Sequence, residues 1–253
     1  MANRSIPGTA ALVLACLTMV PGALGQQVPP EASTARSATT DPHGGIHLDR
    51  LTARQLQTWR SIEQIIQAVD RAGQPLHPRL LSLWRWAQRC SHTIYIELLE
   101  EKDPSIYRAG FFTIQGSNST DSRRIAVIQL YCRVIEEASV QERVRRSDGF
   151  IPFEGLGKLE RYAQVFGHEL AHAALQLGDP IYDRFCRELQ TEEDVFLSSR
   201  QLDRKGTRYD EATLQRLAHI QSLREQLEEP VRSTEVEIWR ELLAGQRARA
   251  AVK

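Results

Sequence analysis

The sequence has no excess of either charge, because 32 lysine and arginine residues balance 32 aspartate and glutamate residues. A protein that binds nucleic acid carries a basic face or stripe, and the basic cluster here (Arg143, Arg145 and Arg146) is short and local. We therefore expect no nucleic-acid partner. The neutral balance also argues against strong attraction to a charged membrane surface.

Cysteine is scarce, and none of the four cysteines stands in a Cys-x-x-Cys pair. A thiolate zinc site is therefore not expected. Apart from Cys16 near the N-terminus, the chain holds Cys90, Cys132 and Cys186. In an oxidising compartment these three would form one disulfide and leave one thiol, or all three would be buried and reduced. The sequence does not select between these arrangements.

Long apolar runs are also missing, except for Ala10–Val20. This run follows Arg4 and precedes Ala23-Leu24-Gly25, a small-x-small cleavage pattern, so residues 1–25 are predicted to be a signal peptide. The run is too short to cross a bilayer comfortably, and a retained N-terminal anchor is the alternative. We expect an exported protein, periplasmic or secreted, with no membrane span after the signal segment is removed.

The rest of the chain divides by composition. Residues 26–49 are rich in Pro, Ala, Ser, Thr and Gly and are predicted to be a disordered linker, followed by a single domain over residues 50–253. Within it, apolar residues at helical spacing predict a helical hairpin over 50–90. β-branched and aromatic residues predict a small, mostly antiparallel sheet over 93–134, with a turn near Gly116–Ser122.

Helical spacing returns in the second half of the chain. Residues 158–177 are predicted to form one helix that Gly178-Asp179-Pro180 ends, and residues 181–247 a helical part. There, Pro230 is expected to start a separate last helix. The predicted fold class is α+β and predominantly helical.

The helix over 158–177 contains His168-Glu169-Leu170-Ala171-His172, a His-Glu-x-x-His motif. Residues four apart lie on one face of a helix, so the imidazoles of His168 and His172 can point at one position in space. Two imidazoles and a third protein ligand suit a tetrahedral Zn²⁺ that keeps one position for water. Glu169 can take a proton from that water as a general base. The motif therefore predicts a zinc site.

On this motif the chain resembles the zincin superfamily of zinc metallopeptidases. The resemblance covers five consecutive residues and one later ligand. The signature with a third histidine soon after the second is absent, because His172 is followed by Ala173-Ala174-Leu175-Gln176-Leu177-Gly178. The resemblance therefore points to the gluzincin-like group, whose third ligand is a glutamate on a later helix. It also implies a zincin-like fold, in which an edge strand above the cleft can pair with an extended peptide.

Four glutamates compete for the third position. Glu235 is favoured because it lies three residues before Ile238, on the apolar stripe of the last helix, where a metal would compensate a buried carboxylate. Glu192 is the main rival, at a short spacing after His172 but inside an acidic cluster. The remaining candidates are Glu237, which falls on the polar face, and Glu193.

These expectations define a function. The protein is predicted to be an exported zinc metallopeptidase that acts on a peptide or protein substrate, with His168, His172 and Glu235 as metal ligands and Glu169 as the catalytic base. A zinc-binding scaffold or sensor in an exported complex is the alternative. A donor for the oxyanion is also expected, and the sequence selects none among Tyr182, Tyr209 and His219. Substrate preference and oligomeric state are not predicted.

Overall fold

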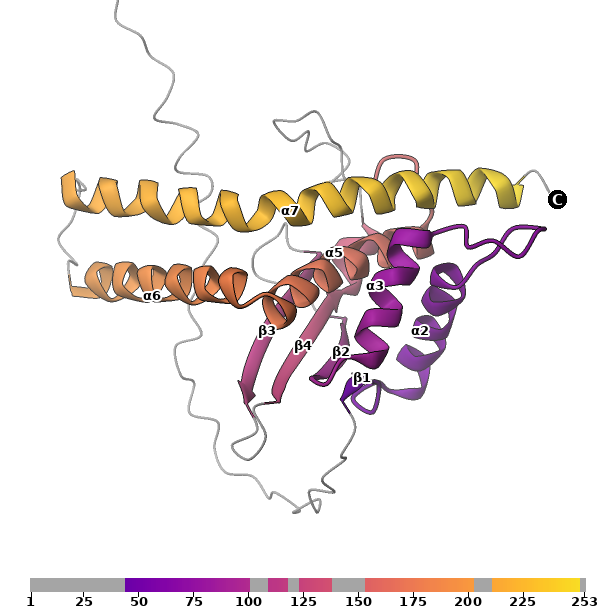
Figure 1. Ribbon diagram of the computed structural model, residues 1–253, viewed down its shortest axis with the longest axis horizontal. Coiled ribbons are helices and arrows are strands. Elements are labelled where there is room, and N and C mark those ends of the chain that lie inside the picture. The colour runs from indigo at the N-terminus through magenta and orange to yellow at the C-terminus, as the bar shows by residue number, and fades with distance from the viewer. Residues whose placement is uncertain (1–43, 101–108, 118–122, 138–152, 203–210, 251–253) are drawn as a thin grey trace, which may run out of the picture.

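A computed structural model describes residues 44–100, 109–117, 123–137, 153–202 and 211–250 (Figure 1). The elements are β1 (Gly45–His47), α2 (Ala53–Ile66), α3 (Pro78–Arg89), β2 (Thr93–Leu99), β3 (Gly110–Ser117), β4 (Arg124–Tyr131), α4 (Cys132–Glu136), α5 (Lys158–Gly178), α6 (Pro180–Leu202) and α7 (Glu211–Ala250). The fold is α+β and mostly helical, as the sequence predicted.

The sheet has the strand order β1-β2-β4-β3 and is mixed. β1, β2 and β4 run parallel, and only the β3–β4 hairpin is antiparallel. The prediction of a mostly antiparallel sheet is therefore wrong. The physical reason lies in β4, where the consecutive residues Ala126, Val127 and Ile128 are all buried. A strand covered on both faces has an unbroken apolar run, which is typical of parallel sheets.

The linker predicted over 26–49 is wrong at its C-terminal end, because Gly45–His47 forms β1 and pairs with β2. Glycine at this point is a packing requirement. Gly45 has φ +106°, and a β-carbon on Gly44 would meet the backbone of Ser91. The two glycines made this segment resemble a linker in composition, but they are needed because the backbone here lies against that of Ser91. The predicted signal peptide and residues 26–43 lie outside the described residues.

The predicted helical hairpin is present as α2 and α3, and both helices pack on α5. Thr52 caps α2 in a reciprocal capping box with Gln55. The contact with α5 centres on three aromatic rings. The ring centroid of Phe166 lies 4.8 Å from that of Trp59 and 5.9 Å from that of Trp84. Complete burial of such a side chain contributes about 1.5–3 kcal/mol, so this cluster fixes α5 against the hairpin.

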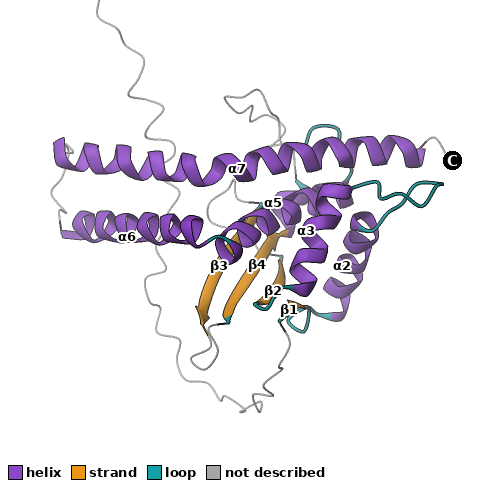
Figure 2. Cartoon of the chain, viewed as in Figure 1, coloured by secondary structure: helices purple, strands orange, loops and turns teal. Residues whose placement is uncertain are grey.

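α7 is one continuous helix that runs along the whole molecule, with α6 beside its N-terminal part (Figure 2). The prediction that Pro230 starts a separate helix is wrong. Pro230 has no N–H to donate to the carbonyl of Gln226, yet the helix continues on both sides. The reason is a single buried stripe that crosses the proline and includes Leu223, Leu227 and Val231.

α5 lies at the centre of this arrangement. It contacts β3 and β4 of the sheet, the α2–α3 hairpin, and both C-terminal helices. The helix that carries the His-Glu-x-x-His motif is therefore held from several sides, and α7 approaches the histidines from the C-terminal part of the chain. Over the described residues, no helix is both long and apolar enough to cross a membrane.

Candidate metal centre

The two histidines of the motif lie one turn apart on α5, which spans the predicted helix with one further residue. Their ring centroids are 4.9 Å apart and the ring planes meet at 70°. The side chains of His168 and His172 are 17% and 19% exposed. Both rings thus remain accessible at one edge while α5 itself is largely buried. A helix at this spacing brings the two imidazoles together as the motif predicted.

Glu228 of α7 is the carboxylate that meets both rings. Its Oε1 lies 3.4 Å from Nε2 of His172, and its Oε2 lies 4.0 Å from Nε2 of His168. Ligand atoms of His168, His172 and Glu228 all lie within 4.8 Å of one another. Two nitrogens and one oxygen at these separations could hold a metal ion.

Glu235, the third ligand favoured from the sequence, lies elsewhere around His168. Its Oε2 is 3.3 Å from Nδ1 of His168, the ring nitrogen opposite the one that faces Glu228. Glu235 is buried, as the apolar stripe predicted, and its Oε1 accepts a hydrogen bond from Gln164. The structure thus places Glu235 behind the histidine and corrects its assignment to the cluster itself. The amphipathic pattern predicted the correct face of α7, but Glu228, which lies on the same face, was not among the predicted ligands.

The other three glutamates lie in ion pairs with arginines, away from the cluster. The pairs are Glu192 with Arg216 at 3.0 Å, Glu193 with Arg224 at 2.6 Å, and Glu237 with Arg79 at 3.4 Å.

Glu228 escaped the sequence analysis because it precedes Glu229-Pro230, which looked like the polar end of a helix. One signal was available. Glu228 and Glu235 are seven residues apart, so a helix continuous through the proline places both on one face, two turns apart. That face is the one turned toward α5. The error about helix continuity and the omission of Glu228 therefore have the same cause.

Tyr182 lies behind His172, at the start of α6. Its hydroxyl is 3.2 Å from Nδ1 of His172 and donates to the carbonyl of Leu227 at 2.8 Å. Burial raises the pKa of Tyr182, so the hydroxyl keeps its proton. Tyr182 was one of three residues considered as oxyanion donor, and this contact directs its proton away from the cluster. Of the other two, His219 of α7 lies beside Glu188 of α6, and Tyr209 is outside the described residues.

The carboxylates set the protonation of the cluster. Burial alone would lower the pKa of His168, but Glu235, with help from Glu169 and Glu228, outweighs it and raises this pKa to about 9. Burial alone would raise the pKa of Glu228, but the hydrogen bond and charge of His172, then His168, bring it to about 2. Three acidic side chains thus surround two imidazoles, an arrangement that favours an added cation.

Glu169, the predicted base, is buried at 6% exposure and lies against the edge strand β3. A β-carbon built on Gly110 would come within 2.6 Å of Oε1 of Glu169 and 2.6 Å of Cγ1 of Val165. The side chain of Glu169 therefore occupies space that only a glycine at position 110 leaves open. This contact joins the motif helix directly to the strand at the edge of the sheet.

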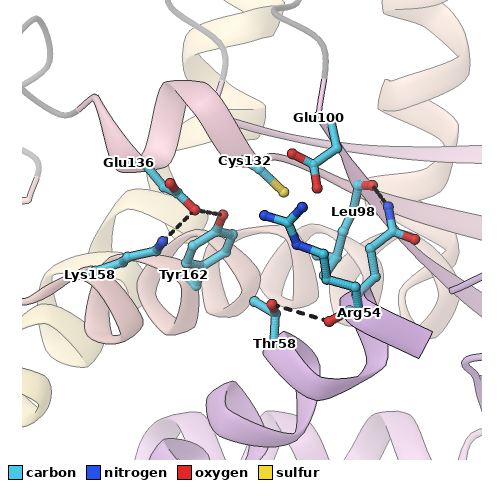
Figure 3. Close-up of a pocket in the computed structure, with 9 residues that line it drawn as sticks. Arg54, Thr58, Leu98, Glu100, Cys132, Glu136, Lys158 and Tyr162 are labelled. Carbon is cyan, nitrogen blue, oxygen red and sulfur yellow. Dashed lines mark hydrogen bonds and ion pairs between the residues drawn. The ribbon is translucent and has the colours of Figure 1, made fainter. Parts of the chain in front are cut away.

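A second cluster of polar groups lies away from the histidines, after the carboxyl ends of β2 and β4 (Figure 3). It lines a cavity of about 130 Å³. Within it, Lys158 pairs with Glu136 at 2.7 Å, and the Tyr162 hydroxyl donates to the same carboxylate at 3.0 Å. Burial raises the pKa of the Cys132 thiol in its wall, which disfavours the nucleophilic thiolate. These contacts join α4 to α5.

Cys90, Cys132 and Cys186 are all free thiols. The structure thus has no disulfide among them, but only Cys132 is buried, whereas Cys90 and Cys186 are half-buried.

Comparison with known proteins found no relative: no family model, no curated protein and no solved structure matches this chain.

Proposed function

We propose that the protein is a zinc-dependent metallopeptidase, with His168, His172 and Glu228 as the metal ligands and Glu169 as the general base. The observation that carries the proposal is the meeting of the two motif imidazoles with the Glu228 carboxylate within 4.8 Å. The donor set supports zinc, which takes imidazole nitrogen and carboxylate oxygen in catalytic sites and keeps a fourth position open.

The local charge supports the same proposal. Glu169, Glu228 and Glu235 all raise the pKa of His168 through their charges. A proton on His168 offsets part of this negative charge, and a divalent cation held by the cluster would offset more of it. An intact glutamate beside the first histidine also favours a catalytic site over a purely structural one, since structural zinc sites are usually closed and rich in cysteine.

The position of β3 supports a peptide substrate. β3 is an edge strand that contacts α5 and pairs on one side only, with β4, within the described sheet. An extended peptide can add to such an edge through main-chain hydrogen bonds. With Gly110 against Glu169, a peptide along β3 would pass close to the base. This arrangement is what supports a zincin-like fold for the chain.

In the proposed reaction, bound zinc supplies Lewis acidity, polarising the peptide carbonyl and lowering the pKa of a water molecule toward 7. Glu169 accepts the proton of the attacking water and passes it to the leaving amine. Its buried position beside β3 limits the number of waters that compete for the same carboxylate. His168 and His172 would hold the metal, and Glu228 would bring compensating negative charge from α7. Export, predicted from residues 1–25, remains part of this proposal.

The experiment that tests the proposal is Glu169→Gln, compared with Glu160→Gln. Glu160 is a second buried glutamate on α5, and it pairs with Arg249 instead of the histidines. We expect Glu169→Gln to retain zinc and to lose hydrolysis of a mixed pool of fluorogenic peptides, while Glu160→Gln keeps both. Peptide turnover that survives Glu169→Gln would overturn the role of Glu169. Zinc bound by the wild type without any peptide hydrolysis would instead favour a zinc-binding scaffold or sensor.

A further inference from the structure

We infer that Glu235 and Tyr182 are positioning residues: they hold the Nδ1–H of His168 and of His172, so that in the metal-loaded protein the Nε2 atoms on the Glu228 side are the ones that bind the metal. The inference rests on the proposed metal centre and assigns two residues to it that contact neither the metal position nor a substrate. Each acts from behind one ring, and the two come from different helices, α7 and α6.

The first contact fixes His168. Nδ1 of His168 lies 3.3 Å from Oε2 of Glu235, and Nε2 of the same ring points toward Glu228. A carboxylate is an acceptor only, so once Nε2 binds a metal the hydrogen of the ring stands on Nδ1, on the side of this carboxylate. The second contact of Glu235, the hydrogen bond from Gln164 at 3.3 Å, holds its carboxylate in place from α5. Nε2 is then the nitrogen left for a metal.

The second contact fixes His172 by a different route. The Tyr182 hydroxyl donates its only proton to the Leu227 carbonyl at 2.8 Å, which leaves its oxygen as an acceptor. Nδ1 of His172, 3.2 Å away, must therefore be the donor. The hydrogen bond between His172 and Tyr182 therefore runs from the imidazole to the hydroxyl oxygen, because the one hydrogen of the hydroxyl is already donated to Leu227.

Tyr182 also connects the two helices that carry the ligands. Leu227 immediately precedes Glu228 on α7, so one hydroxyl contacts the ring of His172 on α5 and the backbone beside Glu228. Asp183, the next residue, is buried and forms two hydrogen bonds with Arg124 of β4, both at 2.7 Å. That ion pair fixes the start of α6 to the sheet, and Tyr182 with it. Such outer contacts raise the basicity of a ligand and set its orientation.

The test uses Tyr182→Phe and Glu235→Met, which remove one acceptor each. Their matched controls are Tyr162→Phe and Glu160→Met, because Tyr162 and Glu160 are buried on α5 and bind Glu136 and Arg249 instead of the histidines. Zinc affinity of the whole protein is measured by competition with a chromogenic chelator. We expect each test variant to bind zinc about 10- to 100-fold more weakly than the wild type, and each control to bind as the wild type does.

Two further measurements separate positioning from a general loss of structure. Glu235→Gln keeps an oxygen acceptor behind His168, so it should recover part of the affinity that Glu235→Met loses. In the zinc-loaded protein, ¹⁵N spectra of the imidazoles should show zinc on Nε2 and hydrogen on Nδ1 of both rings. In Tyr182→Phe, we expect the Nδ1 hydrogen of His172 to lose its protection from exchange, while that of His168 keeps it.

Unchanged zinc affinity in both test variants, or zinc on Nδ1 of either ring, would overturn this inference and leave the proposed metal centre standing. A wild-type protein that binds no zinc would overturn both together. Equal losses in the test variants and their controls would assign the effect to stability and so also contradict a positioning role.

Discussion

Gly110 of the edge strand β3 faces the carboxylate of Glu169 on α5 so closely that a β-carbon at position 110 would lie 2.6 Å from Oε1. Real β-carbons do not approach an oxygen to this distance, so any larger residue must displace the side chain of Glu169 or that of Val165. The strand thereby sets the position of the proposed base. This relationship leads to the first prediction.

Gly110→Ala is expected to lower peptide hydrolysis about 10- to 100-fold, because a small displacement of a catalytic group costs this much. Zinc content should not change, because the atoms nearest to a β-carbon at position 110 belong to Glu169 and Val165 and not to either histidine. The control is Gly116→Ala on the same strand, where a β-carbon would meet no atom within 4 Å. Hydrolysis by Gly110→Ala at the wild-type rate, with zinc bound, would contradict the placement of Glu169.

Gly167, immediately before His168, allows α7 and α3 to approach α5. A β-carbon there would lie 2.7 Å from Cδ1 of Ile238 and 2.9 Å from Cδ1 of Leu80. Overpacking of this kind costs about 1–3 kcal/mol, whereas alanine gains about 1 kcal/mol of helix propensity over glycine. We expect the overpacking to outweigh the gain, so Gly167→Ala lowers the free energy of unfolding in urea by roughly 1 kcal/mol.

Gly178→Ala is the matched control for that change. Gly178 is the last residue of the same helix, and a β-carbon there meets nothing within 4 Å. We expect its free energy of unfolding to stay equal or to rise slightly. Stabilisation by Gly167→Ala as large as that by Gly178→Ala would show that α3 and α7 do not pack on Gly167 as described.

His77, at the start of α3, predicts how stability depends on pH. The residue is completely buried, and burial together with the charge of Arg249 lowers its pKa from 6.5 to about 4. The unfolded chain therefore binds a proton near pH 6.5 that the folded chain accepts only near pH 4. This contribution to stability is complete above pH 6.5 and is lost as pH falls from 6.5 toward 4. The loss amounts to roughly 3 kcal/mol.

The measurement is urea unfolding of the wild type and of His77→Gln from pH 7 to pH 4. We expect the wild type to lose stability over this range more steeply than the variant, because glutamine does not titrate. His219→Gln serves as the control, since His219 is half exposed on α7. Parallel curves for the wild type and His77→Gln would show that His77 is protonated equally in the folded and unfolded chains.

The local features of the fold could be predicted from the sequence. The hairpin helices, the strand over Thr93–Leu99 and the motif helix have strong periodicity and clear boundaries, so propensity and packing agree there. Strand direction could not be predicted in the same way. β2 and β4 pair in parallel although β3 lies between them along the chain, and this pairing depends on which faces the helices cover.

In the candidate site, too, the local relations could be predicted from the sequence and the contacts between elements could not. His168, Glu169 and His172 are adjacent on one helix, so their relation follows from helical geometry alone. The position of the carboxylate from α7 depends on how two helices pack, and the amphipathic pattern predicts only the buried face on which Glu235 lies. Glu228 sits on that face too, but its position follows only if α7 continues through Pro230. Tertiary packing decided this continuity against the local signal of a proline.

The most direct test of the central claim is the zinc content of the purified full chain and of Glu228→Ala, with Glu229→Ala as the neighbouring control. Glu228 contacts both histidine rings, whereas Glu229 is exposed on the next position of α7. We predict one zinc per chain in the wild type and in Glu229→Ala, and little or none in Glu228→Ala after dialysis against a weak chelator. Full zinc occupancy in Glu228→Ala, or no zinc in the wild type, would contradict the metal centre described here.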